Sequence, residues 1–149
     1  MSSPTLTEIL KQAWASGDPG AMARAIPFAR FMGMEIVRDG GRLLARLPFA
    51  PHLVGNAMLP ALHGGALGAL LESIGIFAVM AEDESPLPPK TISVTIEYLR
   101  SARTVDTFAR ADIIRQGRRV ATVRAVAWQD DEAKPVASAT VQLLLPSRG

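Results

Sequence analysis

One carboxylate stands out in this sequence because of the residues around it. From Ala66 to Ala81, all sixteen residues are apolar or small except Glu72. An ionised carboxylate is costly to bury among such neighbours, and a positioned carboxylate can act as a general base or a nucleophile. A Glu paired with an Arg, or one that a helix presents to solvent, is the alternative that this residue alone leaves open.

A second group with chemical potential, His63-Gly64-Gly65, lies just before it. Paired glycines at the start of a helix let the backbone approach a ligand closely. The free N–H groups and positive dipole end there stabilise charge developing on a carbonyl oxygen. Glu72 lies seven to nine residues after these three, about 12 Å along a helix axis. We therefore expect a site shared across a dimer interface, with a simple tight turn as the alternative for the three residues.

The sequence lacks the residues that several other kinds of site would need. The chain has no cysteine, which excludes disulfides, Cys-bound metals and a Cys nucleophile. His52 and His63 are the only histidines, too few for a three-His zinc site, and we expect no metal. Neither a G-x-S-x-G nucleophile turn nor a G-x-x-x-x-G-K-[ST] phosphate loop occurs.

The charge distribution is uneven along the chain. The net charge of the 149 residues is only +2, yet seven Arg lie between Arg100 and Arg124 against Asp106 and Asp112, a local +5. Arg suits phosphate groups, so this stretch is either a set of solvated strand edges or an anion site. With one Tyr and no long apolar span or signal peptide, we expect no nucleic acid or membrane partner and a cytoplasmic location.

The pattern of elements predicts an α+β fold. Residues 1–30 are expected to form an N-terminal helical extension, and residues 31–149 the main domain. That domain begins with a hairpin over 34–48 and a loop over 48–62, followed by a buried helix over 66–81. Alternating strands follow at 91–98, 107–116, 119–129 and 136–145. Consecutive strands favour an antiparallel sheet packed on the helix, and its edges call for a homo-oligomer.

Two phrases, Leu62-His63-Gly64-Gly65 and Leu71-Glu72-Ser73-Ile74-Gly75, resemble the hotdog-fold thioesterases of the phenylacetate-pathway and 4-hydroxybenzoyl-CoA thioesterase type. The strand phrase Thr91–Ser101 is also similar. The resemblance implies a curled antiparallel sheet around one long helix, assembled as a homodimer or homotetramer. It also implies hydrolysis of an acyl-CoA thioester, with CoA as part of the substrate and no further cofactor.

The resemblance also assigns roles to residues. Glu72 would be the general base or nucleophile, the Gly64 N–H would polarise the thioester carbonyl, and His63 and Asn56 would complete that catalytic pocket. Residues expected to contact the substrate are Gly65, Met58, Ile76 and, for the CoA phosphates, Arg103, Arg118 and Arg119. Several relatives carry Ser or Thr where this chain has Ile76, so water is expected to be positioned differently here.

Two other functions remain open at this point. A hotdog dehydratase or hydratase would use a His and Glu pair, for which His52 and Glu72 are the candidates, but the chain lacks the Asp-x-Asn-Pro-x-His motif. A non-catalytic acyl-CoA binding module is the other alternative. A medium-chain or aromatic acyl group is expected, in a pocket drawn from Leu71, Ile76, Phe77, Met80, Met58 and Leu59.

Overall fold

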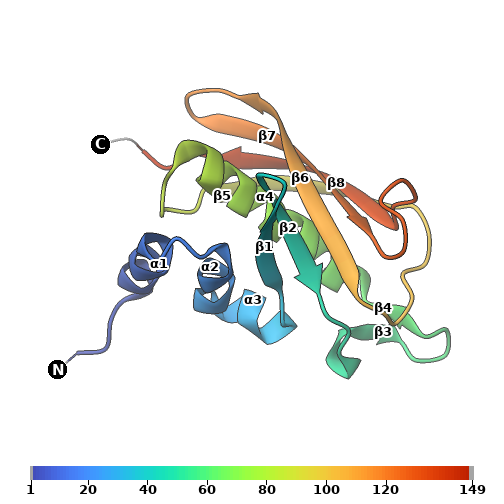
Figure 1. Cartoon of the computed structure of the whole chain (residues 1–149). Coiled ribbons are helices and arrows are strands. Elements are labelled where there is room, and N and C mark those ends of the chain that lie inside the picture. Colours follow the sequence, from blue (N-terminus) through green and yellow to red (C-terminus); the bar gives the residue numbers. More distant parts are fainter. Residues whose placement is uncertain (1, 148–149) are drawn as a thin grey trace.

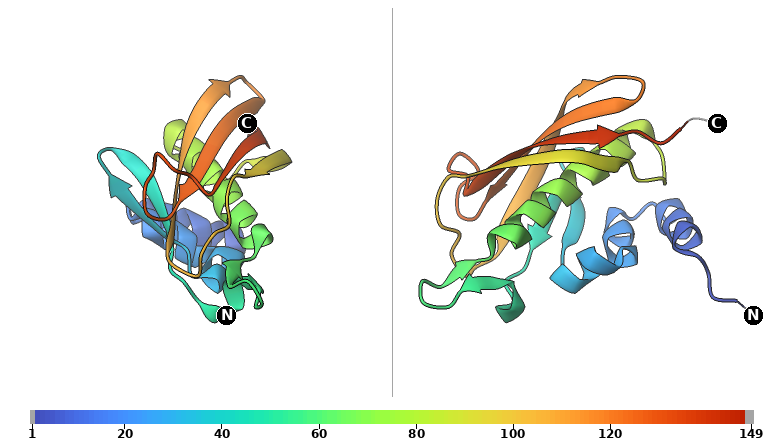
Figure 2. Two further views of the ribbon diagram at one scale, coloured as in Figure 1. Left: turned by 90° about the vertical axis from the view of Figure 1, so that its right-hand side faces the viewer. Right: turned by 180° about the vertical axis from the view of Figure 1, so that it is seen from behind.

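The centre of the molecule is one long helix, α4 (Gly64–Asp83), held in the curve of a six-stranded sheet (Figure 1). The computed structural model describes residues 2–147. Seen end-on, the sheet curls around one side of α4, and the N-terminal helices lie on another side (Figure 2). This confirms the predicted α+β hotdog fold.

The sheet is antiparallel throughout and has the order β1-β2-β6-β7-β8-β5. Its strands are β1 (Glu35–Asp39), β2 (Arg42–Leu47), β5 (Lys90–Tyr98), β6 (Thr107–Gln116), β7 (Val120–Trp128) and β8 (Ala137–Leu144). The predicted strands and hairpins are confirmed. Between β1 and β2, Gly40 and Gly41 have φ of 60° and 80°, as the tight hairpin turn requires. β5, the first strand after α4, is one of the two edge strands of this sheet.

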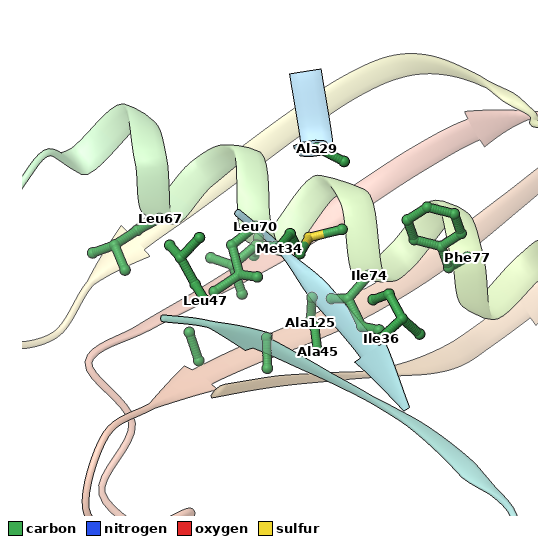
Figure 3. Packing of buried hydrophobic residues seen from close by; sticks show 14 of the residues in the cluster. Ala29, Met34, Ile36, Ala45, Leu47, Leu67, Leu70, Ile74, Phe77 and Ala125 are labelled. Atoms are coloured by element: carbon green, nitrogen blue, oxygen red, sulfur yellow. The ribbon is translucent and has the colours of Figure 1, made fainter. Parts of the chain in front are cut away.

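Small side chains on the sheet let α4 pack closely against it. Fully buried alanines line the concave face, among them Ala45 and Ala125, opposite Leu70 and Ile74 of the helix (Figure 3). Gly68 and Gly75 contribute from the helix side: a Cβ on Gly68 would lie 2.7 Å from Ile96 Cδ1, and one on Gly75 3.5 Å from Val123. Close packing of this kind sets the position of the helix against the sheet.

Three short helices precede the sheet: α1 (Leu6–Ala15), α2 (Pro19–Ala25) and α3 (Pro27–Met32). α1 starts with a capping box, in which the Thr5 hydroxyl accepts from the Glu8 N–H at 3.2 Å and the Glu8 carboxylate accepts from the Thr5 N–H at 2.7 Å. α2 and α3 bury Met22 and Met32 in the core, whereas α1 packs mainly on α2. The helical extension is therefore joined to the core by its second and third helices.

The predicted loop over residues 48–62 contains structure that we did not predict. It forms a short 3-10 helix, η1 (Pro51–Leu53), and a two-stranded hairpin of β3 (Val54–Asn56) and β4 (Ala61–Leu62). Strands of two and three residues are too short for their periodicity to be recognised. This hairpin leads directly into α4.

Among the helices that the structure describes, α4 alone is long and apolar enough to cross a membrane by composition. Half of its most apolar stretch is buried inside the protein. Packing against the sheet explains why the sequence of α4 is so apolar.

Candidate active site

The first turn of α4 is built around the side chain of His63. His63 is the residue that caps this helix, and its Nδ1 accepts the Gly65 N–H at 2.8 Å. A nitrogen that accepts carries no proton, so in the neutral ring the proton is on Nε2. The three residues are therefore the N-terminus of a 20-residue helix, and the alternative of a simple tight turn is wrong.

Gly64 presents the one free N–H of the glycine pair. Within residues 2–147 it forms no hydrogen bond, whereas the Gly65 N–H is already bonded to His63. The Gly64 carbonyl oxygen accepts from the Tyr98 hydroxyl at 2.7 Å. A free N–H at the positive end of a long helix can donate to a substrate carbonyl oxygen and stabilise negative charge there.

Tyr98 is a site residue that no sequence motif singled out. It is the only tyrosine in the chain and lies at the end of β5 nearest the first turn of α4. A Cβ on Gly64 would lie 3.0 Å from its hydroxyl oxygen. The sequence did contain one signal for this role: Tyr98 lies on the same face of β5 as Ile96, and that face turns towards the helix.

The β3–β4 hairpin packs directly on His63. A Cβ on Gly55 would lie 2.6 Å from His63 Cα, so this strand can approach only because it carries glycine. The Asn56 side-chain oxygen accepts from the N–H groups of Met58 and Leu59 at 3.0 and 3.2 Å. Asn56 thus closes the hairpin turn next to His63, and Met58 at the tip is 91% exposed.

Glu72 lies two turns further along α4, on a side of the helix that the rest of the chain leaves partly open. Its side chain is half-buried, as are those of Ala69 and Ile76 on the same side. It has no hydrogen bond or ion pair with any described residue, so the alternative of a Glu–Arg pair is not what the chain forms. Leu71, by contrast, is fully buried in the core.

One chain does not bring Gly64 and Glu72 to the same point. The helix between them is continuous, so their eight-residue separation corresponds to about 12 Å along its axis. Each residue is partly exposed and its group is unpaired within the described residues, but the two lie on different turns of α4.

The three arginines expected to hold CoA phosphates lie at two ends of the sheet. Arg103 lies beside β4, where it bridges to Ala61, and it forms an ion pair with Asp130. Arg118 and Arg119 lie in the β6–β7 turn, next to the Leu144 end of β8. Since β5 spans about 26 Å from that end to Tyr98, a single chain places only Arg103 near Gly64.

Part of the local positive charge is balanced by carboxylates from outside the stretch. Among the described residues, Arg103 pairs with Asp130, and Arg110 pairs with Asp39 and Glu132. These two of the seven arginines in the stretch from Arg100 to Arg124 are therefore already engaged within the chain.

His52 and Glu72, the candidate pair for a dehydratase, belong to different parts of the molecule. His52 is exposed in η1, where its Nε2 lies 3.0 Å from the Phe31 carbonyl oxygen and its ring 4.9 Å from the Phe31 ring. Within the chain, the structure gives no support to a His52–Glu72 pair.

Comparison with known proteins identifies the family. Residues 55–144 match the family described as Acyl-CoA thioesterase N-terminal domain. The chain is also 31% identical over 135 residues to the medium/long-chain acyl-CoA thioesterase YigI of Escherichia coli K12, covering 80% of this chain and 86% of that protein.

Solved structures agree with this sequence similarity. A protein of the thioesterase superfamily superposes with a TM-score of 0.79 at 25% identity, covering 91% of this chain and 99% of the other. A Bacillus halodurans protein solved with CoA has the same fold, with a TM-score of 0.70 at 24% identity and coverage of 99% of each chain. The chain therefore belongs to the hotdog-fold acyl-CoA thioesterases, enzymes that hydrolyse the thioester bond of acyl-CoA.

Proposed function

We propose that Glu72 is the carboxylate that drives hydrolysis and that the Gly64 N–H polarises the thioester carbonyl, releasing a free acid and CoA. The observation that carries this proposal is the pair of unpaired groups: one N–H at the start of a long helix, and one carboxylate on its partly open side. The two supply what acyl transfer needs, a donor for the carbonyl oxygen and a base or nucleophile for the carbonyl carbon.

The missing half of each site comes, in this proposal, from a second copy of the chain. β5 is an edge strand of nine residues with Ile92 and Tyr98 more than half exposed, and long exposed edges invite pairing with another strand. An antiparallel β5–β5 pair would continue the sheet from one subunit into the next.

The register of such a pair follows from the contacts between α4 and β5. Gly64 touches Tyr98 and Gly68 touches Ile96, so four helix residues match two strand residues in length. Glu72 then lies at the level of Val94. A two-fold axis near Ile96 would set the Tyr98 level of one subunit against the Val94 level of its partner. Gly64 of one chain would thereby face the partner's Glu72.

Two routes of bond making and breaking fit this arrangement. With Glu72 as a general base, the carboxylate takes a proton from water as the water oxygen bonds to the carbonyl carbon. The C–S bond then breaks and the CoA sulfur takes the proton. With Glu72 as a nucleophile, its oxygen bonds to the carbonyl carbon, CoA leaves, and water hydrolyses the resulting anhydride. Ile76, one turn along, offers no hydroxyl to position that water.

The remaining expected residues have supporting roles in the proposal. His63 holds the first turn of α4 and offers Nε2–H outward, and Asn56 fixes the hairpin beside it. Arg103 is the candidate for a CoA phosphate on the Gly64 side, and Arg118 and Arg119 could serve only from a partner subunit. Because YigI is named a medium/long-chain enzyme, we infer a medium or long acyl group as the substrate.

The test is the Glu72→Gln variant, assayed with a panel of acyl-CoA esters. Loss of the catalytic carboxylate is expected to lower kcat by at least about 100-fold, while acyl-CoA binding by calorimetry is retained. Glu82→Gln, an exposed carboxylate on the same helix, is the matched control and should keep the native rate. An unchanged rate in Glu72→Gln would refute the assignment, and hydration of crotonyl-CoA without hydrolysis would favour the dehydratase.

A further inference from the structure

A pocket of about 390 Å³ lies between the N-terminal helices α1 and α2, the β1–β2 hairpin and the second half of α4. Its large apolar side chains come from every one of these elements: Trp14, Met22, Ile36, Leu43, Phe77 and Met80. Protein interiors leave few voids larger than a water molecule, and this volume is within the range of small-molecule sites. The pocket therefore has the size of a binding site.

The lining is ordered from an apolar floor to a polar mouth. Met22, Ile36, Phe77 and Met80 are each at most 4% exposed, which places them deep. Asp18, Arg38 and Glu84, the charged residues of the lining, are exposed. Such a gradient suits a flexible hydrocarbon chain, and the two methionines can adapt to its shape.

The same helix that carries Glu72 provides a wall of this pocket. Phe77 and Met80 follow Glu72 by five and eight residues, about 7.5 and 12 Å along the axis. Residues four apart on a helix are neighbours, so Ile76 joins Glu72 to Met80 along one row of side chains. Ile76 is half-buried, and hydrocarbon can lie on it between the carboxylate and the pocket.

We propose that this pocket receives the far end of the substrate's acyl chain, and that the N-terminal helices thereby set the preferred chain length. This rests on the proposed role of Glu72. An extended chain needs roughly ten C–C bonds of about 1.5 Å to cover 12 Å. Acyl groups longer than this reach the pocket, and short ones end over Ile76. Trp14, half-buried on α1, is the side chain of the outermost helix in the lining.

The first test reduces the pocket from β2. Leu43→Trp adds bulk on the face of β2 that packs towards the core, and Leu44→Trp adds the same bulk one residue along, on the other face. With straight-chain acyl-CoA esters of roughly four to sixteen carbons, we expect Leu43→Trp to lower kcat/KM for the longest chains by about tenfold or more. Rates for the shortest chains, and all rates of Leu44→Trp, should stay native. A uniform change, or none, overturns the proposal.

The second test measures binding of the acyl chain when no hydrolysis takes place. The chain has two tryptophans, so in a Trp128→Phe variant the emission reports on Trp14 alone. A long-chain acyl-CoA thioether, which cannot be hydrolysed, should shift that emission, and an acetyl thioether should not. Equal responses to both probes overturn the proposal.

Failure of this inference can be told apart from failure of the proposed function. If Glu72→Gln is inactive but Leu43→Trp keeps the native chain-length profile, only the assignment of the pocket is wrong. If Glu72→Gln is fully active, the catalytic proposal is wrong, and the pocket must then be judged on the fluorescence of Trp14 alone.

Discussion

At the scale of single residues, the two glycine N–H groups at the start of α4 differ in whether they are bonded within the chain. The His63 side chain caps the helix by accepting the Gly65 N–H, and the neighbouring N–H of Gly64 remains free. Tyr98 fixes the Gly64 peptide from the other side by donating to its carbonyl oxygen. In the proposed mechanism this donor is held in place before a substrate arrives, which is what makes such groups effective.

Replacing Gly64 by proline isolates the contribution of that N–H. Gly64 is the first residue of α4, where proline is well tolerated because the position needs no intrahelical donor. We expect Gly64→Pro to lower kcat by about 100- to 1,000-fold while circular dichroism shows a native fold. Gly64→Ala is the control, since it adds a Cβ against Tyr98 but keeps the N–H. Equal loss in both variants would show that crowding, and not the donor, is responsible.

At the scale of elements, the Asp106 carboxylate, just before β6, connects this strand to the end of β2 and to the segment leading into η1. Asp106 accepts from the Phe49 N–H at 2.8 Å and from Arg46 at 2.7 Å, and Arg46 also binds Glu35 at 2.9 Å. The Phe49 N–H, followed by the Arg46 guanidinium, holds the pKa of Asp106 below its usual value. The bonds therefore favour the ionised form in the folded protein.

This lowered pKa predicts a loss of stability in acid. A carboxyl group whose pKa is lower in the folded state than in the unfolded state adds stability above its unfolded pKa, near 3.9. That contribution disappears as the pH falls through the folded pKa. Denaturant unfolding from pH 7 to pH 2 should show Asp106→Asn less stable than the native chain at neutral pH, with the gap closing below about pH 4. Two curves that stay parallel throughout would contradict this role.

At the scale of the whole molecule, one chain forms the whole sheet and helix but keeps the two proposed catalytic groups, Gly64 and Glu72, apart. The open sides of α4 and β5 lie next to each other, since Gly68 packs on Ile96, and both would be covered by one partner. A two-fold assembly that pairs these surfaces would produce two equivalent sites, and closed symmetric dimers are the commonest oligomers.

The proposed register can be tested by a disulfide, since the chain has no cysteine of its own. With a two-fold axis at Ile96, Thr95 of one chain lies opposite Glu97 of the other, both exposed on the outer face of β5. Oxidised Thr95→Cys/Glu97→Cys protein should run as a covalent dimer on a non-reducing gel. Thr95→Cys alone, with no thiol opposite, should remain a monomer on that gel. Absence of a cross-link in the double variant would rule out this pairing.

The local elements and the residues available for chemistry follow from the sequence alone. The apolar run with one carboxylate predicts α4, and the alternation in β5 and the Asp39-Gly40 turn predict strands and a hairpin, because these patterns depend on neighbours a few residues apart. The spacing of Gly64 and Glu72 likewise predicts a site shared between two chains, since a continuous helix keeps the two residues apart.

Which distant segments meet is decided only by the closed tertiary fold. The edge position of β5, the bond between Tyr98 and Gly64, the short hairpin on His63 and the pocket under Trp14 all join residues far apart in the chain. No local periodicity encodes such contacts. They arise when the whole sheet closes on one helix and small residues decide how near each segment can come.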